Sequence, residues 1–117
     1  MRAPMLGLMF AGSFERRKQV ASDQARITHA HPLGVEASAM MAEVAACAYE
    51  EEAPRLLERA HEVCTASAFR EPLKRALGWE EQMALPAALQ VRKELGNGIT
   101  AVESCPTAVY LAQRFLE

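Results

Sequence analysis

Residues 56–67 read Leu-Leu-Glu-Arg-Ala-His-Glu-Val-Cys-Thr-Ala-Ser, and this stretch decides the fold class. Its apolar and small residues recur at helical spacing; they are Leu56, Leu57, Ala60, Val63, Cys64 and Ser67. Because residues three and four apart share one face of an α-helix, the stretch predicts an amphipathic helix whose apolar face is buried in the core. His61 falls on the polar side of this helix, so we interpret it as a surface residue.

The overall composition also favours helices. The chain has 117 residues, enough for one small domain with a modest hydrophobic core. Alanine occupies 22 positions, whereas valine, isoleucine and threonine together occupy only 13. Because alanine favours helices and β-branched residues favour strands, this balance predicts an all-α fold. We expect about five or six helices and no sheet of more than two short strands.

Cap residues predict two helices on the N-terminal side of residues 56–67. Ser13 is a candidate N-cap for a helix over residues 14–26. The next helix is expected to begin at a proline that suits the first helical turn, with Thr28 or His31 in front of it.

Three further helices are expected on the C-terminal side, over residues 70–77, 86–95 and from residue 106 to the end. Gly78 should end the first, Gly96 should follow the second, and Ser104 should cap the third. The last helix is expected to bury the side formed by Val109, Tyr110, Ala112 and Phe115. The three glutamates at residues 50–52 are expected to open the helix that follows them, since negative charge is stabilised at a helix N-terminus.

The charge pattern excludes two classes of partner. Thirteen lysines and arginines are outnumbered by 15 acidic residues, giving a formal net charge of -2. We therefore expect no nucleic-acid binding, and we interpret the cluster Arg16-Arg17-Lys18 as a solvated helix face. No run of about 18 uncharged apolar residues is present, so no membrane-spanning helix is expected.

The cysteines and the N-terminal residues bear on the cellular compartment. Cys47, Cys64 and Cys105 are an odd number with no paired spacing, and we interpret them as buried small apolar residues. Residues 1–13 imitate a secretory signal in having one arginine, a short apolar stretch and small residues, but the apolar stretch is weak. A reducing cytoplasm is the compartment that we expect.

Two segments contain residue types that could take part in chemistry. His29 and His31 could share a metal ion only in an extended backbone; the alternatives are a capping role or contact with a ligand. Residues 96–98 read Gly-Asn-Gly, which indicates either a helix end with a tight turn or a place where the backbone approaches a ligand closely. Glu103 and Ser104 fit a capping pair better than catalytic groups.

Three blocks of the chain carry a family resemblance. Residues 94–110 read Glu-Leu-Gly-Asn-Gly-Ile-Thr-Ala-Val-Glu-Ser-Cys-Pro-Thr-Ala-Val-Tyr, residues 27–34 read Ile-Thr-His-Ala-His-Pro-Leu-Gly, and residues 1–8 read Met-Arg-Ala-Pro-Met-Leu-Gly-Leu. In this order and with these separations the blocks resemble the ADP-ribosylglycohydrolase family, most closely the branch that removes ADP-ribose from serine. The resemblance covers essentially the whole chain.

The resemblance implies an orthogonal all-α bundle like the middle part of that fold, with a pair of magnesium ions that orient the ribose for hydrolysis. The family takes its metal ligands from a Thr-Asp-Asp motif upstream and a Gly-Gly-Asp-Thr-Asp-Thr motif downstream, and neither occurs here. Asp23 is the only aspartate in the chain. We therefore expect residues 1–117 to be a single incomplete domain, without metal ligands, catalytic residues or a bound cofactor of its own.

Carried over position by position, the resemblance assigns His29 to the ADP-ribose pocket and Gly98 with Ile99 to the turn that closes over the ligand. We expect a fragment or truncated form of a hydrolase that removes ADP-ribose from protein or a small molecule, inactive alone and with weak ADP-ribose binding. The alternative is a non-enzymatic helical interaction module. A homo-oligomer is expected in either case, through an apolar contact formed by Met5, Leu8, Met9, Phe10, Tyr110 and Phe115.

Overall fold

The protein is described by a computed structural model that covers residues 2–29, 31–83 and 85–115. These residues form seven helices and no strand, which confirms the all-α prediction but exceeds the expected five or six helices. The helices are α1 (Ala3–Met9), α2 (Phe14–Thr28), α3 (Pro32–Glu50), α4 (Leu56–Val63), α5 (Ser67–Glu81), α6 (Ala88–Leu95) and α7 (Ala101–Phe115). The additional helix is α1, which the sequence pattern indicated only as a short apolar segment.

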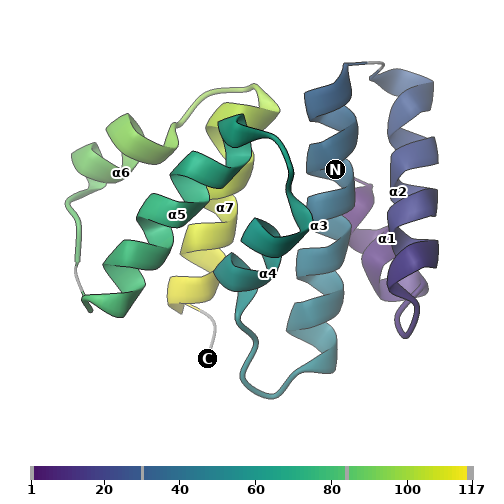
Figure 1. Ribbon diagram of the computed structural model, residues 1–117, viewed down its shortest axis with the longest axis horizontal. Helices are drawn as coiled ribbons and strands as arrows, with labels where there is room; N and C mark the ends of the chain where they lie inside the picture. Colours follow the sequence, from purple (N-terminus) through teal and green to yellow (C-terminus); the bar gives the residue numbers. More distant parts are fainter. Residues whose placement is uncertain (1, 30, 84, 116–117) are drawn as a thin grey trace.

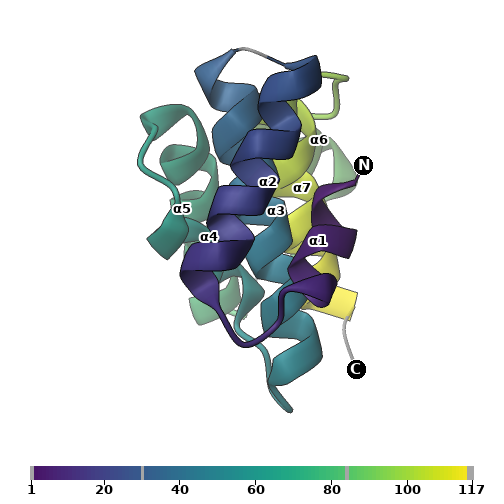
Figure 2. The same cartoon turned by 90° about the vertical axis from the view of Figure 1, so that its right-hand side faces the viewer.

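Helix α3 lies in the middle of the molecule and separates two groups of helices. Figure 1 shows α1 and α2 on one side of α3 and α4 to α7 on the other. Among the described residues, α1 and α2 pack on each other and on α3, whereas α3, α4 and α5 all pack on α7. The view in Figure 2 shows α1 and α2 side by side in front of α3. None of the seven helices is long and apolar enough to cross a membrane.

The stretch that decides the fold class is interrupted after Val63. Its apolar side chains Leu56, Leu57, Ala60 and Cys64 are buried as predicted, but Cys64 has an extended backbone and a new helix begins at Ser67, which is exposed. The prediction of one continuous helix is therefore wrong.

The interruption has a tertiary cause, a carboxylate from another helix. Oε1 of Glu36 in α3 accepts hydrogen bonds from the backbone N–H groups of Thr65, at 2.5 Å, and Ala66, at 2.9 Å. The guanidinium group of Arg70 donates to the carbonyl oxygens of His61 and Cys64, both at 2.8 Å. The free backbone groups on both sides of the break are thus hydrogen-bonded by side chains. The spacing of residues within residues 56–67 does not reveal these contacts.

Three other boundaries differ from the sequence prediction. Helix α5 passes through Gly78, because the partly buried side chains of Leu77 and Trp79 on either side of it pack against the core and outweigh its low helix propensity. Helix α7 begins at Ala101, so Ser104 lies inside the helix and does not cap it. The glutamates at residues 50–52 end α3 and do not open α4, whose first amides bond instead to the side chain of Gln113 at 2.5 Å and 3.4 Å.

The core is apolar on one side of α3 and partly charged on the other. On the side of α4 to α7, fully buried Phe69, Leu73 and Val109 pack with Met40 of α3. On the side of α2, Arg17 is only 3% exposed, and its guanidinium group donates to both carboxylate oxygens of buried Glu43 at 2.9 Å. The interpretation of residues 16–18 as a solvated face is therefore wrong for Arg17.

The prediction of which side of α7 is buried is correct for two of its four residues. Val109 and Tyr110 are buried, and the Tyr110 ring packs edge-on against Trp79 with the ring centres 5.5 Å apart. Ala112 and Phe115 are exposed, because the packed face of α7 runs through Pro106, Val109, Tyr110 and Gln113. Tyr110 is consequently not available for the intermolecular contact in which the sequence analysis placed it.

Candidate functional site

The loop between α6 and α7 is built around Gly96. Gly96 ends α6 with a φ of 104°, and its N–H donates to the Arg92 carbonyl at 3.1 Å. The Gly96 carbonyl in turn accepts from Thr107 Oγ1 at 2.7 Å. A side chain at this position would be strained by the positive φ and would collide with the backbone of Glu103, whose Cα would lie 2.7 Å from a Cβ. The predicted glycine stop after this helix is confirmed.

The start of α7 is organised by Thr100 and Glu103. Thr100 Oγ1 donates to Glu103 Oε2 at 2.6 Å, and Ser104 Oγ donates to the Thr100 carbonyl at 2.8 Å. The Glu103 carboxylate occupies the place where a Cβ on Gly98 would have to stand. This contact does not by itself require glycine at position 98, because the carboxylate is the far end of a flexible side chain. Glu103 has a role in the helix start, as expected, with Thr100 as its partner.

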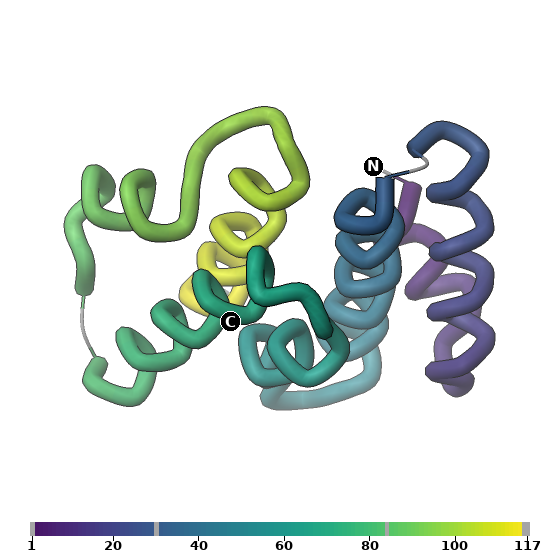
Figure 3. The backbone as a smooth tube through the Cα atoms, turned by 45° about the horizontal axis from the view of Figure 1, so that its top comes forward, coloured from purple at the N-terminus to yellow at the C-terminus, as the bar shows by residue number. Residues whose placement is uncertain are grey.

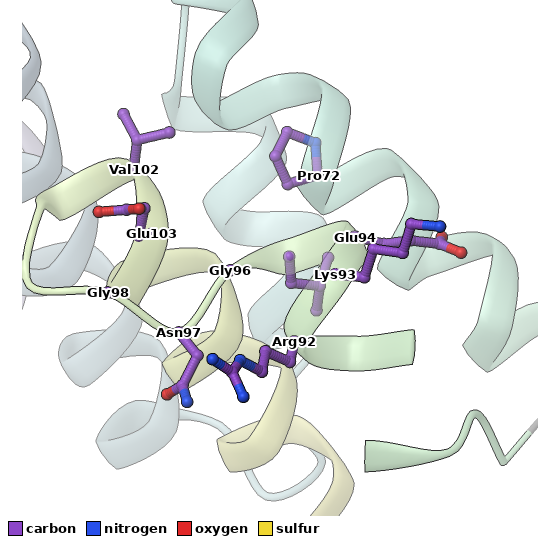
Figure 4. Close-up of a pocket in the computed structure, with 10 residues that line it drawn as sticks. Pro72, Arg92, Lys93, Glu94, Gly96, Asn97, Gly98, Val102 and Glu103 are labelled. Carbon is purple, nitrogen blue, oxygen red and sulfur yellow. The ribbon is translucent and has the colours of Figure 1, made fainter. Parts of the chain in front are cut away.

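A cavity of about 430 Å³ opens beside this loop. It is bordered by the last turn of α6, the loop, the first turn of α7 and Pro72 of α5. Figure 4 shows the Arg92 guanidinium group and the Asn97 side chain extending to the same side of the loop, while the Glu103 carboxylate lies on the other side, near Gly98. The cavity thus combines two glycines, an amide and a cation in one short segment.

The two histidines before α3 have different surroundings. His31 is the N-cap of α3, and its Nδ1 accepts from the N–H of Leu33 at 3.2 Å, so the predicted capping role is confirmed. His29 ends α2 with an extended backbone, is exposed, and places its Nδ1 2.8 Å from the hydroxyl oxygen of Thr28. The capping bond occupies Nδ1 of His31 and leaves Nε2 as its other ring nitrogen.

The predicted ligand-contacting segments lie at the same end of the molecule. The junction between α2 and α3, which carries His29, and the loop between α6 and α7, which carries Gly98 and Ile99, are both found at the upper end in Figures 1, 2 and 3. Gly98 borders the cavity, whereas His29 and Ile99 do not. Ile99 is fully exposed. The fold brings the segments to one end but does not place the three residues in one cavity.

The described residues do not fit a divalent metal ion. Among them no group of three or more histidine, cysteine, aspartate or glutamate side chains is arranged as a metal site. The carboxylate of Asp23 is exposed on α2, where it accepts from Gln19 at 2.9 Å and from Arg26 at 3.0 Å. The Glu103 carboxylate is already bonded to Thr100. Magnesium prefers several oxygen ligands converging from separate segments, and neither carboxylate has such companions.

The cysteines are not candidates for a nucleophile. Burial raises the pKa of the Cys64 thiol to about 12 and that of Cys47 to about 11. The Cys64 thiol lies 3.2 Å from the sulfur of Met40 in the core. Since the thiolate is the reactive form, thiols with raised pKa values in apolar surroundings are inert, in agreement with their interpretation as small apolar residues.

A second hollow, of about 550 Å³, lies beside the loop between α3 and α4. Gln113 borders it, and the Gln113 amide is occupied on both sides, donating to the Pro54 carbonyl at 3.2 Å and accepting from Leu56 N–H. These bonds hold the loop in place, so we interpret the hollow as a consequence of how this loop packs. The cavity beside Gly98 remains the better candidate for ligand contact.

Sequence reasoning missed Arg92 and Asn97 as members of the cavity. Asn97 was expected only as part of a turn, and Arg92 carried no predicted role. The available signal was the spacing of Arg92 and Gly96, which are four residues apart and therefore share one face of the helix end.

Comparison with known proteins identifies one relationship. The model of a family described as ADP-ribosylglycohydrolase matches residues 1–117. Searches of curated proteins and of solved structures found no match.

Proposed function

The chain belongs to the ADP-ribosylglycohydrolase family, and on this premise we propose that it contacts an ADP-ribose ligand through His29, Gly98 and Ile99. The observation that carries the proposal is the placement of the α2–α3 junction and the α6–α7 loop at one end of the molecule. Gly98 borders the cavity, and the exposed Ile99 offers an apolar surface to a base or ribose.

The proposal includes the absence of hydrolysis by this chain alone. Hydrolysis at the anomeric carbon needs a positioned water and a polarised ribose, and in the resemblance both depend on two magnesium ions. A single aspartate, engaged with Gln19 and Arg26, cannot hold such a pair. Without metals, ligand binding rests on a few polar and apolar contacts, so we expect a Kd of about 1 mM, or ~4 kcal/mol.

The finer family assignment is also a proposal. The block over residues 94–110 supports the branch that removes ADP-ribose from serine. For the compartment we propose the cytoplasm, because three cysteines in the reduced state fit a reducing environment. Binding of a serine-linked ADP-ribosyl peptide more tightly than an arginine-linked one would support the branch assignment, and fractionation of cells would test the compartment.

Binding is tested by titrating the 117-residue chain with ADP-ribose and following backbone amide signals by nuclear magnetic resonance. We expect shifts at residues 29 and 96–100 and at least threefold weaker binding in His29→Ala, about the loss of one hydrogen bond. The matched control is His61→Ala, on α4, which should bind as the wild type does. Equal binding by wild type and His29→Ala would contradict the assignment of His29. Magnesium-dependent release of ADP-ribose from a modified peptide would contradict the proposed inactivity.

The second candidate is a non-enzymatic interaction module that self-associates. It is favoured by exposed apolar side chains on two helices, with Met9 of α1 69% exposed and Phe115 of α7 75% exposed. Met5 and Leu8 add to the surface of α1. Sedimentation equilibrium at micromolar concentration is the test, and a stable particle of 12.9 kDa would contradict self-association.

A further inference from the structure

The exposed side of α7 is apolar. Four of its exposed residues follow one another at spacings of three, one and three along the helix and lie opposite its buried side; they are Ala108, Leu111, Ala112 and Phe115. From residue 104 to residue 115 the helix has one charged side chain, Arg114, whose guanidinium group lies 3.7 Å from the carboxylate of Glu80. The outer side of α7 is therefore an uncharged surface in contact with water.

Helix α1 has a similar outer side, which faces the same direction. Its buried residues are Ala3 and Gly7, and the residues on the opposite side of the helix, Met5, Leu8 and Met9, are exposed. Residues 3–10 contain no charged side chain. Figure 2 shows α1 and α7 on the side of the molecule opposite α5, against which α7 packs. We call the three exposed residues of α1 and the four of α7 the outer face.

The outer face is large enough for a dimer interface. At about 200 Å² for a fully exposed large apolar residue, its exposed fractions leave about 600 Å² of side chain open to water. The largest apolar patch on a monomeric protein covers about 300–600 Å². A stable interface buries about 800 Å² on each partner, of which somewhat more than half is apolar. The outer face thus reaches the upper limit for a monomer and supplies the apolar share of an interface.

We propose that the outer face binds the outer face of a second copy of this chain, about a two-fold axis that passes close to Leu111. Each residue near such an axis meets its own copy, so a charged residue there would meet a like charge. The outer face has no charged residue. It also combines small and large side chains, so Leu111 of one copy can pack between Ala108 and Ala112 of the second copy.

This inference rests on the second candidate function, for which it names the partner and the contact, and it does not depend on ADP-ribose binding. Leu89 provides a matched control for Leu111. It is also an exposed leucine in a helix, but it lies at the start of α6, which Figure 1 shows at the end of the molecule away from α1. A glutamate at either position changes the net charge equally, and only the glutamate at position 111 lies in the proposed contact.

The experiment is sedimentation equilibrium of wild type, Leu111→Glu and Leu89→Glu. We expect wild type to form a particle of twice 12.9 kDa, with a Kd of dimerisation of about 1–10 µM, at the weak end for an interface of this size. Leu111→Glu places two like charges near the axis and should raise this Kd at least tenfold, whereas Leu89→Glu should change it by less than about twofold. Far-ultraviolet circular dichroism shows whether both variants keep the fold.

A charge-pairing experiment tests the two-fold arrangement. Leu111→Glu and Leu111→Lys should each dimerise weakly alone. An equal mixture of the two should associate at least about fivefold more tightly, because position 111 of one copy then meets the opposite charge in the second copy.

The outcomes separate this inference from the proposed functions. A wild type that sediments at 12.9 kDa at every concentration would overturn both the inference and the second candidate function. A wild-type dimer that Leu111→Glu does not weaken, or that Leu89→Glu weakens equally, would overturn the outer face as the contact and leave self-association standing. A mixture of Leu111→Glu and Leu111→Lys that associates no more tightly than either variant alone would overturn the two-fold arrangement. None of these results bears on the titration with ADP-ribose.

Discussion

The two sides of α3 are held by different forces. On the side of α4 to α7, the contact is made by large apolar side chains, with Phe69, Leu73 and Val109 fully buried. On the side of α1 and α2, the contact is made by small residues and the buried ion pair of Arg17 with Glu43, whose Oε1 also lies 3.0 Å from Nε of Arg59 in α4. One helix can therefore be anchored by the hydrophobic effect on one face and by a geometrically specific polar contact on the other.

This difference predicts that substitutions on the two sides of α3 lower the stability of the fold in different ways. Burial of an aromatic ring is non-directional, so the apolar side should lose stability in proportion to the volume removed. A buried ion pair depends on both partners, so the other side should respond to small chemical changes that hardly alter volume.

The largest effect is expected at Phe69. Phe69→Ala removes a fully buried ring from the centre of the apolar side and should lower the free energy of unfolding by about 3–5 kcal/mol. Urea denaturation followed by circular dichroism measures the change. Tyr49→Ala, at an exposed aromatic residue of α3, is the control and should cost less than about 0.5 kcal/mol. Similar losses in the two variants would show that the apolar side is not the main anchor.

The second effect is expected at the ion pair. Glu43→Gln leaves the buried Arg17 guanidinium group with only the partly exposed carboxylate of Glu50, at 3.5 Å, as a counter-charge, so the free energy of unfolding should fall by about 3 kcal/mol. Replacing both partners, Arg17→Met with Glu43→Leu, should restore part of the stability, because the two apolar side chains need no compensation for each other and only Arg59, whose Nε lies 3.0 Å from Glu43 Oε1, loses its counter-charge. If the double variant is as unstable as Glu43→Gln, the ion pair contributes more to the free energy of unfolding than the neutralisation of its two charges by each other.

A smaller effect is expected where α1 crosses α3. Gly7 is buried, and a Cβ on it would overlap the carbonyl group of Ala42 in α3. Gly7→Ala should therefore push α1 away and lower the free energy of unfolding by about 2 kcal/mol. Gly78→Ala is the matched control, because Gly78 lies in a helix with open space around it and alanine should stabilise that helix by about 0.5–1 kcal/mol. Thermal unfolding of the two variants should shift in opposite directions.

The smallest effect is expected from His61, on the pH dependence of the free energy of unfolding. Burial, reinforced by the charges of Arg70 and Lys74, lowers the pKa of His61 below its usual 6.5. The imidazole of His61 therefore binds a proton more readily in the unfolded chain than in the folded chain. The stability that neutral His61 contributes is present above about pH 6.5 and is lost as the pH falls through the folded pKa. His61→Asn should flatten the fall in stability between about pH 7 and about pH 5. An unchanged pH profile would show that His61 titrates alike in both states.

The sequence predicted the helical class, and the caps show why it could. Ser13, His31 and Gly96 stand at helix ends as expected, because capping and positive φ depend on residue type and on immediate neighbours. The His31 cap and the Gly96 turn also placed the α2–α3 junction and the α6–α7 loop correctly. Of the three ligand contacts that the family resemblance implies, only Gly98 borders the cavity.

The failures are at positions where a distant residue supplies the decisive contact. The break after Val63 depends on Glu36, and the burial of Arg17 depends on Glu43. The start of α4 depends on Gln113 from the last helix. In each case the local pattern was compatible with two structures, and a hydrogen bond from far along the chain selected one.

The sequence by itself determined the secondary-structure class, the helix ends at Ser13, His31 and Gly96, and the apolar set of the core, because propensity, capping and periodicity act within a few residues. Only the tertiary structure decided which charges are buried, where the helix over residues 56–67 breaks, and that Arg92 extends along the same edge of the cavity as Asn97. The physical reason is that polar groups are satisfied by whichever partner the packing brings near, and packing is a property of the whole chain.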